Sequence, residues 1–405
     1  MRYPGAGISA ASGGSAGVTR EGIHTLAKGT MGKKLRIAVL YNEPLVGTEE
    51  GRKYISENGQ LKDGPPVRKP TKPVPAGKPV ATQELIDLSE IGVVEEMDDI
   101  KAALNALGYR TTTFNVDGDI MRLIQYLREV KPDLIFNLVE CVENDSLQEM
   151  NVAGIYELFK IPYTGASALA LGIALNKPLV KKILTFHGIK TPRFQVFSPA
   201  EKIVPGPDFV FPAIVKPSHE DASVGIDDGS VVYNLNDLRK RVRFIVSEYE
   251  QPALAEQYID GRELNVAITG NRDPEVLPIS EIDFSGLTDD MHRIVSYEAK
   301  WVHGTIAFEG TRGVCPAPVT PLQEAKIKDI ALRCYRIIGC RDYARVDFRL
   351  TKEGVPYVLE VNPNPDISDD AGFARSARAY GLSFPQIVGT IVESALERCR
   401  PQQRA

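Results

Sequence analysis

The stretch from Tyr343 to Asn364, YARVDFRLTKEGVPYVLEVNPN, constrains the fold more than any other part of the chain. Polar and apolar residues alternate over 343–350 and again over 357–362, which is the period of a β-strand. Between the two runs, Lys352-Glu353-Gly354 has the composition of a turn. The pattern therefore predicts a β-hairpin.

The apolar positions of this hairpin predict its register. If Leu350 faces Tyr357 across the two strands, then Phe348 faces Leu359, and one face of the hairpin is apolar throughout. A slip of one residue would exchange the two faces, so the pattern itself supports this pairing.

The same register places charged residues directly opposite one another on the polar face. Asp347 faces Glu360, and Arg345 faces Asn362. Two opposed carboxylates repel each other, so a cation between them is expected. Carboxylate and amide oxygens suit Mg²⁺. For the hairpin taken alone, a polar side that simply faces solvent is the simpler interpretation.

Length and composition exclude several classes of protein. A chain of 405 residues predicts two or three domains, and its 43% apolar residues suffice for a large core. The net charge of −5 argues against a basic nucleic-acid-binding protein. The five cysteines are scattered without a CxxC pair, so we expect neither a zinc site nor disulfides, and the cytoplasm as compartment. No apolar run reaches the roughly 18 residues of a membrane span.

Two segments differ in composition from the rest. Residues 1–34 are rich in Gly, Ser and Ala up to Thr30, so we expect a disordered tail, or a true start at Met31. Residues 51–80 hold six prolines and seven Lys or Arg against two acids, which is typical of a flexible insertion. We therefore expect a solvated insertion without a specific role.

Strand and helix patterns alternate over residues 35–165. Short apolar runs predict strands, and amphipathic stretches between them predict helices. This order is typical of a doubly wound α/β domain. The predicted strands are Leu35–Tyr41, Arg110–Asn115 and Asp133–Leu138, and the clearest helices are Ile120–Glu129 and Leu147–Phe159.

Farther along, several charged residues stand next to turns. Asn176 can cap a helix whose first turn holds Lys177. Lys216 ends the strand FPAIVK, and a small polar loop over 218–225 follows, whose backbone N–H groups could bind phosphate. Glu256 and Glu263 flank a strand–turn–strand and could bind the amino and hydroxyl groups of a nucleotide. Judged locally, all of these could instead be surface charges.

Taken in order, eight motifs resemble the ATP-grasp enzymes, and most closely their D-alanine–D-alanine ligase branch. The resemblance covers residues 35 to about 398. The motifs are IPYTGA (161–166), ALNKP (174–178), FPAIVKPS with SVG (211–225), ALAEQYIDGREL (253–264), SYEAKW (296–301), CPAP (315–318), RVDFR (345–349) and LEVNPNP (359–365).

The resemblance implies an α/β chain, α+β in its ATP-grasp part, with ATP held between two antiparallel β-sheets. It implies three domains: an N-terminal domain over 35–165, a central lid domain over 166–252 and a C-terminal catalytic domain over 253–400.

It also implies roles for individual residues, with ATP and Mg²⁺ (or Mn²⁺) as cofactors. Lys177 and Lys216 would contact the ATP phosphates or the nearby base, and Ser223 would lie in the closing loop. Glu256, Gln257 and Ile259 would line the adenine site, and Glu263 would bind the ribose. Asp347, Glu360 and Asn362 would hold two Mg²⁺; of the catalytic residues, Lys300 would meet the phosphates and Arg345 would stabilise the oxyanion.

The chain departs from the family's pattern around the amino-acid substrates. Glu43 is only a candidate for the family's glutamate in the first loop, and LVECVENDS (138–146) replaces HGxxGEDG. Trp301 stands in place of a tyrosine. Asp366 replaces a glycine, and Ala371 replaces a serine that binds the second substrate's carboxylate. We count Glu43, Trp301 and Asp366 as candidate substrate residues.

These departures predict a ligase that joins a carboxylate to an amine on small amino acids other than a pair of D-alanines. A genuine D-alanine–D-alanine ligase, a non-catalytic ATP-binding regulatory protein and a phosphotransferase acting on a hydroxyl are the alternatives. We expect small amino acids as partners, neither nucleic acid nor membrane, and leave a homodimer open.

Overall fold

The computed structural model describes residues 34–43, 45–48, 51–55, 61–63, 88–143, 145–198, 202–368 and 371–399. Contacts divide the chain into Met1–Lys34 and Leu35–Ala405, and every element below lies in the second unit. The predicted tail therefore lies outside the described residues, apart from Lys34, and so do all residues from 64 to 87. Among the described helices, none has the length and apolar character that a membrane span requires.

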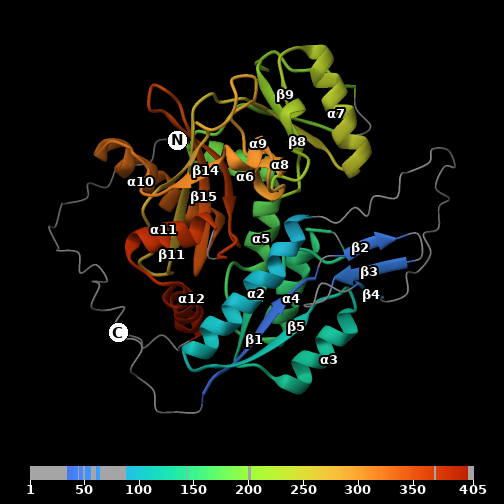
Figure 1. The fold of residues 1–405 in the computed structure, drawn as a ribbon, viewed down its shortest axis with the longest axis vertical. Coiled ribbons are helices and arrows are strands. Elements are labelled where there is room, and N and C mark those ends of the chain that lie inside the picture. Colours follow the sequence, from blue (N-terminus) through green and yellow to red (C-terminus); the bar gives the residue numbers. More distant parts are fainter. Residues whose placement is uncertain are drawn as a thin grey trace, which may run out of the picture. The chain divides into compact units, whose positions relative to one another are not determined.

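The first sheet is parallel, with the order β5–β1–β6. The strands β1 (Arg36–Tyr41), β5 (Arg110–Asn115) and β6 (Leu134–Leu138) match the predicted ones. Alternate residues of β1 face opposite ways: Val39 packs in one core with α2 (Leu88–Ala106), whereas Leu40 packs in another with α3 (Ile120–Val130) and α4 (Gln148–Phe159). Figure 1 shows α2 and α3 beside this sheet. These strands therefore form a parallel sheet with helices packed on both of its faces.

Part of the segment expected to be a flexible insertion forms strands. The strands β2 (Leu45–Thr48), β3 (Gly51–Ile55) and β4 (Leu61–Asp63) make an antiparallel sheet of their own. All six prolines of 51–80 come at position 65 or later, so nothing in 51–63 prevents strand pairing. Residues 64–80 lie outside the described part of the chain.

The second sheet is antiparallel, with the order β7–β10–β8–β9. Its strands are β7 (Phe194–Phe197), β8 (Ala213–Pro217), β9 (Val231–Val232) and β10 (Ala253–Gln257). Helix α7 (Leu235–Tyr249) contributes Leu238, Val242 and Ile245 to the core of this sheet. The strand β10 pairs with β7 and β8, so the residues around Glu256 belong to this sheet.

The third sheet is antiparallel and has six strands. Its order is β14–β13–β11–β15–β16, with β12 paired to β11. The strands are β11 (Arg262–Thr269), β12 (Glu275–Val276), β13 (Ser280–Asp283), β14 (Arg312–Val314), β15 (Tyr343–Leu350) and β16 (Pro356–Asn362). The short helices α8 (Tyr297–Trp301) and α9 (Ile306–Glu309) lie in the connection between β13 and β14.

Helices pack on both faces of this sheet. The side chains of α6 (Lys177–Phe186) and α10 (Pro321–Ile338) share one core with β11, β15 and β16. On the other face, α11 (Gly372–Tyr380) and α12 (Phe384–Cys399) join the core that includes β1. Helix α5 (Ala168–Leu175) contacts α4 and β16.

The hairpin predicted from the sequence is present as β15 and β16, but half of its predicted register is wrong. Asp347 faces Glu360 and Arg345 faces Asn362 as expected. A β-bulge then shifts the pairing, so that Phe348 faces Val358 and not Leu359. Alternation within each strand cannot reveal an extra residue between two paired segments.

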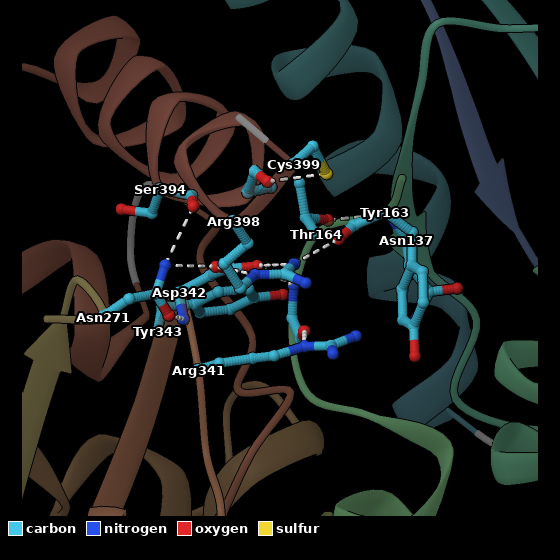
Figure 2. Close-up of polar contacts among 12 residues, drawn as sticks. Asn137, Tyr163, Thr164, Asn271, Arg341, Asp342, Tyr343, Ser394, Arg398 and Cys399 are labelled. Carbon is cyan, nitrogen blue, oxygen red and sulfur yellow. Dashed lines mark hydrogen bonds and ion pairs between the residues drawn. The ribbon is translucent and has the colours of Figure 1, made fainter. Parts of the chain in front are cut away.

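A buried aspartate joins three parts of the chain at the start of β15 (Figure 2). Asp342 is fully buried and accepts hydrogen bonds from Gly165 N at 3.0 Å, from Asn271 Nδ2 at 2.9 Å and from Arg398 Nη2 at 2.6 Å. Arg398, on α12, also donates to Tyr163 O at 2.7 Å. This network fixes the loop after β6 against the third sheet and α12.

Asp342→Asn should destabilise the protein by about 3 kcal/mol, because a buried ion pair loses one partner. Asparagine keeps the volume of the side chain and tolerates the left-handed backbone of this residue, whose φ is 63°. The shift of the urea unfolding midpoint measures this cost. Asp260→Asn is the control, since the Lys352–Asp260 pair is exposed and should contribute less than about 1 kcal/mol. Equal shifts in both variants would contradict the role of Asp342.

Candidate active site

A cleft opens between the four-stranded and the six-stranded sheet. Lys216 of β8 and Glu256 of β10 line one side, and Asp347 of β15 and Glu360 of β16 line the other. The space amounts to about 830 Å³, including the open solvent at its mouth. Nine predicted site residues line this cleft: Lys177, Lys216, Ser223, Glu256, Gln257, Ile259, Glu263, Asp347 and Glu360.

Two lysines share one buried carboxylate at the back of the cleft. Glu256 Oε2 lies 2.9 Å from Lys216 Nζ, and Glu256 Oε1 pairs with Lys181 Nζ. Burial by itself would raise the pKa of Glu256, but the two ammonium groups outweigh it, so the pKa is lowered. Glu256 is therefore an anion although it is only 1% exposed.

Lys177 lies at the first turn of α6, where Asn176 caps the helix as predicted by accepting a hydrogen bond from Leu179 N at 3.0 Å. The Lys177 ammonium pairs with Asp221 and lies 3.6 Å from Glu360 Oε2. Burial opposes its charge, yet these carboxylates keep its pKa above the ordinary value. Lys177 is thus a cation held at the edge of the cleft beside the hairpin.

The polar face of the hairpin carries a bidentate ion pair. Arg345 Nε and Nη2 each lie 2.8 Å from an oxygen of Asp347, and Asn265 Nδ2 donates to Asp347 Oδ1 at 2.7 Å. Burial raises the pKa of the Asp347 carboxyl, and the Arg345 guanidinium opposes that shift. The positive charge of Arg345 therefore compensates the negative charge of Asp347.

Glu360 faces Asp347 but has weaker contacts. Arg345 Nη2 lies 4.0 Å from Glu360 Oε1. Burial alone would raise the pKa of Glu360, but the surrounding ammonium groups and Arg345 outweigh it and lower the pKa to about 2. The next polar residue of β16, Asn362, accepts a hydrogen bond from Asn364 N at 2.9 Å through its amide oxygen.

The donor set of this hairpin fits a hard divalent cation. Asp347, Glu360 and Asn362 offer two carboxylates and one amide oxygen on paired strands. Within the described residues, no group of three or more His, Cys, Asp or Glu side chains could hold a metal ion. A cation here would thus need further oxygen ligands, such as those of a phosphate chain.

Glu263 lies deeper along β11 and is paired with an arginine that the sequence did not single out. Arg349 Nη2 lies 2.9 Å from Glu263 Oε2, and Arg349 Nη1 donates to Gly261 O at 3.0 Å. Burial raises the pKa of Glu263, with Arg349 opposing the shift. The pair fixes the carboxylate at the cleft wall.

The loop over 218–225 closes one side of the cleft. Ala222 and Ser223 both have a left-handed backbone, with φ of 53° and 63°. Ser223 Oγ donates to Val295 O at 2.8 Å, and Trp301 Nε1 donates to Ala222 O at 2.9 Å. The strained loop is therefore held by the segment before and within α8.

The remaining predicted residues lie outside the cleft lining. The Lys300 ammonium lies 4.5 Å from the centre of the Trp301 ring. Glu43 accepts a hydrogen bond from Tyr41 Oη at 3.1 Å. Asp366 accepts one from Ser368 N at 2.8 Å. These three side chains are not among the described residues that line the cleft, and neither are Arg345 and Asn362.

Four residues that support the site were missed from the sequence: Lys181, Asp221, Asn265 and Arg349. Each acts through another side chain that the motifs did identify. The spacing of Lys177 and Lys181, one helical turn apart, could have indicated that both point to one side. The partners of Asn265 and Arg349 come from neighbouring strands, and strand pairing is needed to find them.

The chain is similar to proteins of one known family. The family "D-ala D-ala ligase C-terminus" matches residues 184–393. A D-alanine–D-alanine ligase from Desulforudis audaxviator (strain MP104C) is 32% identical over 303 residues, covering 73% of this chain and 91% of that protein. The protein y4sG of Sinorhizobium fredii (strain NBRC 101917 / NGR234) is 31% identical over 371 residues, covering 90% of this chain and 98% of that protein.

The fold also matches a solved structure, that of a D-alanine–D-alanine ligase from Bacillus anthracis complexed with ATP. The TM-score is 0.63 at 22% identity, and the match covers 90% of this chain and 98% of that one. The family match spans more than half of the 405 residues. The chain therefore belongs to the D-alanine–D-alanine ligase family and has its ATP-grasp fold.

Proposed function

We propose that this protein is an ATP-dependent carboxylate–amine ligase that acts on small amino acids other than a pair of D-alanines. The observation that carries the ligase assignment is the polar face of the β15–β16 hairpin. Asp347 and Glu360 face each other there, Arg345 adjoins both, and the cations Lys177 and Lys216 line the same cleft.

The proposed reaction has two steps. A carboxylate oxygen of the first substrate attacks the γ-phosphate of ATP, which gives an acyl phosphate and ADP. The amine of the second substrate then attacks the acyl carbon, a proton leaves the nitrogen, and phosphate departs as the amide forms. The tetrahedral intermediate of this second step carries an oxyanion, which fixed positive charge at Arg345 would stabilise.

The cleft residues would bind the nucleotide. Lys177 and Lys216 would neutralise phosphate oxygens, and Lys300 would join them, since charge neutralisation dominates phosphoryl transfer. Glu256, Gln257 and Ile259 would line the adenine, and Glu263 would bind the ribose hydroxyls. The loop around Ser223 would exclude water, which would otherwise hydrolyse the acyl phosphate.

Asp347, Glu360 and Asn362 would hold Mg²⁺, or Mn²⁺ in its place. A divalent cation there would supply positive charge to the phosphate oxygens during transfer. The lowered pKa of Glu360 supports this assignment, because its carboxylate is ionised and available as a ligand.

The residues around the amino-acid site support a substrate other than D-alanine. Asp366 lies near Arg345 and near Glu96, a 5%-exposed carboxyl whose Oε1 accepts a hydrogen bond from Ile367 N at 2.9 Å. Burial, with Asp366 adding to it, raises the pKa of Glu96. A free α-carboxylate would meet repulsion there, whereas an amine would be attracted. Trp301 contacts the closing loop where the family has a tyrosine.

A second candidate function is a genuine D-alanine–D-alanine ligase. It is supported by the name of the relative from Desulforudis audaxviator, which is a D-alanine–D-alanine ligase. A non-catalytic ATP-binding protein is the alternative of another class. It has no need of the complete set Arg345, Asp347, Glu360 and Asn362.

Asp347→Asn should lower amine-dependent ADP release by at least about 100-fold, the scale on which one electrostatic group contributes to catalysis. The substitution keeps the volume of the side chain, so the thermal midpoint should change little compared with activity. The control is Asp329→Asn, an exposed aspartate on α10. Full activity of Asp347→Asn would refute the assignment of the metal site.

An ADP-release screen over paired L- and D-amino acids and small carboxylates, with mass spectrometry of the product, tests the substrate. We expect a pair other than two D-alanines to give the highest rate and an amide product. If D-alanine alone drives ADP release as well as any other pair, the proposed specificity is wrong and the second candidate holds. ADP release without an amide product would exclude ligation altogether.

A further inference from the structure

One buried lysine near the cleft has no role in the proposed reaction. Lys181 lies on α6, one turn after Lys177, is 1% exposed and is not among the described residues that line the cleft. Its ammonium donates to Thr191 Oγ1 at 3.0 Å and to Leu359 O at 2.9 Å, and it pairs with Glu256. These three partners match the three protons of an ammonium group.

Two of these partners belong to the two sheets that form the cleft. Glu256 is on β10 of the four-stranded sheet, and Leu359 is on β16 of the six-stranded sheet. Leu359 is also the extra residue of the β-bulge, and Glu360, which follows it, faces Asp347. One ammonium group therefore holds the bulge in β16 and the carboxylate of β10 at the same time.

The charges around Glu256 give this contact a consequence for the cleft. Glu256 is shared between Lys181 and Lys216, and of these two lysines only Lys216 lines the cleft. With both lysines present, two positive charges face one negative charge. Without Lys181, Glu256 and Lys216 would form a neutral pair, and Lys216 would lose much of its attraction for an anion.

We propose that Lys181 is a positioning residue, which occupies Glu256 so that the charge of Lys216 stays available to the phosphates of the nucleotide. The inference rests on the proposed nucleotide site. It makes Lys181 important for the anionic part of the ligand and much less important for the nucleoside part.

Lys181→Met tests the proposal through binding of ATP and of adenosine, measured by calorimetry or by competition with a fluorescent nucleotide. We expect ATP to bind at least about tenfold more weakly than to the wild type, because an ion pair next to the anion site has lost one member. Adenosine should bind within about threefold of the wild-type affinity, because it lacks phosphate. The matched control is Lys182→Met, an exposed lysine on the same helix.

If Lys181 had a purely structural role, Lys181→Met would weaken the binding of ATP and of adenosine alike, and that result would overturn the proposal. Binding of ATP to Lys181→Met at wild-type affinity would also overturn it. If the wild-type protein bound no ATP, the proposed function itself would be wrong. If the wild type binds ATP and only the expected difference in Lys181→Met is missing, the inference about Lys181 is wrong and the proposed function is unaffected.

A second variant removes both charges. In Lys181→Met with Glu256→Gln, the carboxylate that pairs directly with Lys216 is gone, so ATP should bind within about threefold of Glu256→Gln alone. This pair of proteins also decides the question if Lys181→Met does not fold, since the double variant contains no unpaired buried carboxylate. A further tenfold loss in the double variant would contradict the proposal.

Discussion

Two carboxylates on adjacent strands of one sheet impose the main constraint on this protein. Asp347 and Glu360 face each other on β15 and β16, and both are largely shielded from water. Like charges in that position destabilise a sheet unless cations compensate them. Arg345 compensates Asp347 directly, and Lys177 approaches Glu360 from the start of α6. The fold around the hairpin therefore places the cationic side chains of Arg345 and Lys177 next to these two carboxylates.

The same principle extends across the cleft. Glu256 is matched with Lys181 and Lys216, and Glu263 with Arg349. Buried ion pairs contribute little net stability, since the loss of hydration offsets their attraction. Their arrangement in a cleft between two sheets is better explained by a highly charged ligand than by stability. The Asp342 network is different, because it lies away from the cleft and fixes the loop after β6 to α12.

Much of this could be predicted from the sequence. The strands of the first sheet and the helix α10 follow clear apolar periods, and the facing of Asp347 and Glu360 followed from alternation. The bulge at Leu359 and the two short helices between β13 and β14 could not be predicted from the sequence, because they depend on contacts with distant segments. The supporting residues Lys181 and Arg349 were missed for the same reason, since each acts through a partner far away in the chain.

The central claim is that the polar face of the hairpin binds a divalent cation next to a bound nucleotide. Crystals grown with Mn²⁺ and a non-hydrolysable ATP analogue, measured at the manganese absorption edge, test it most directly. We predict an anomalous peak between Asp347 and Glu360, with the phosphates directed toward Lys177 and Lys216. A nucleotide bound in the cleft with no peak at these carboxylates, or with the metal bound elsewhere, would contradict the account.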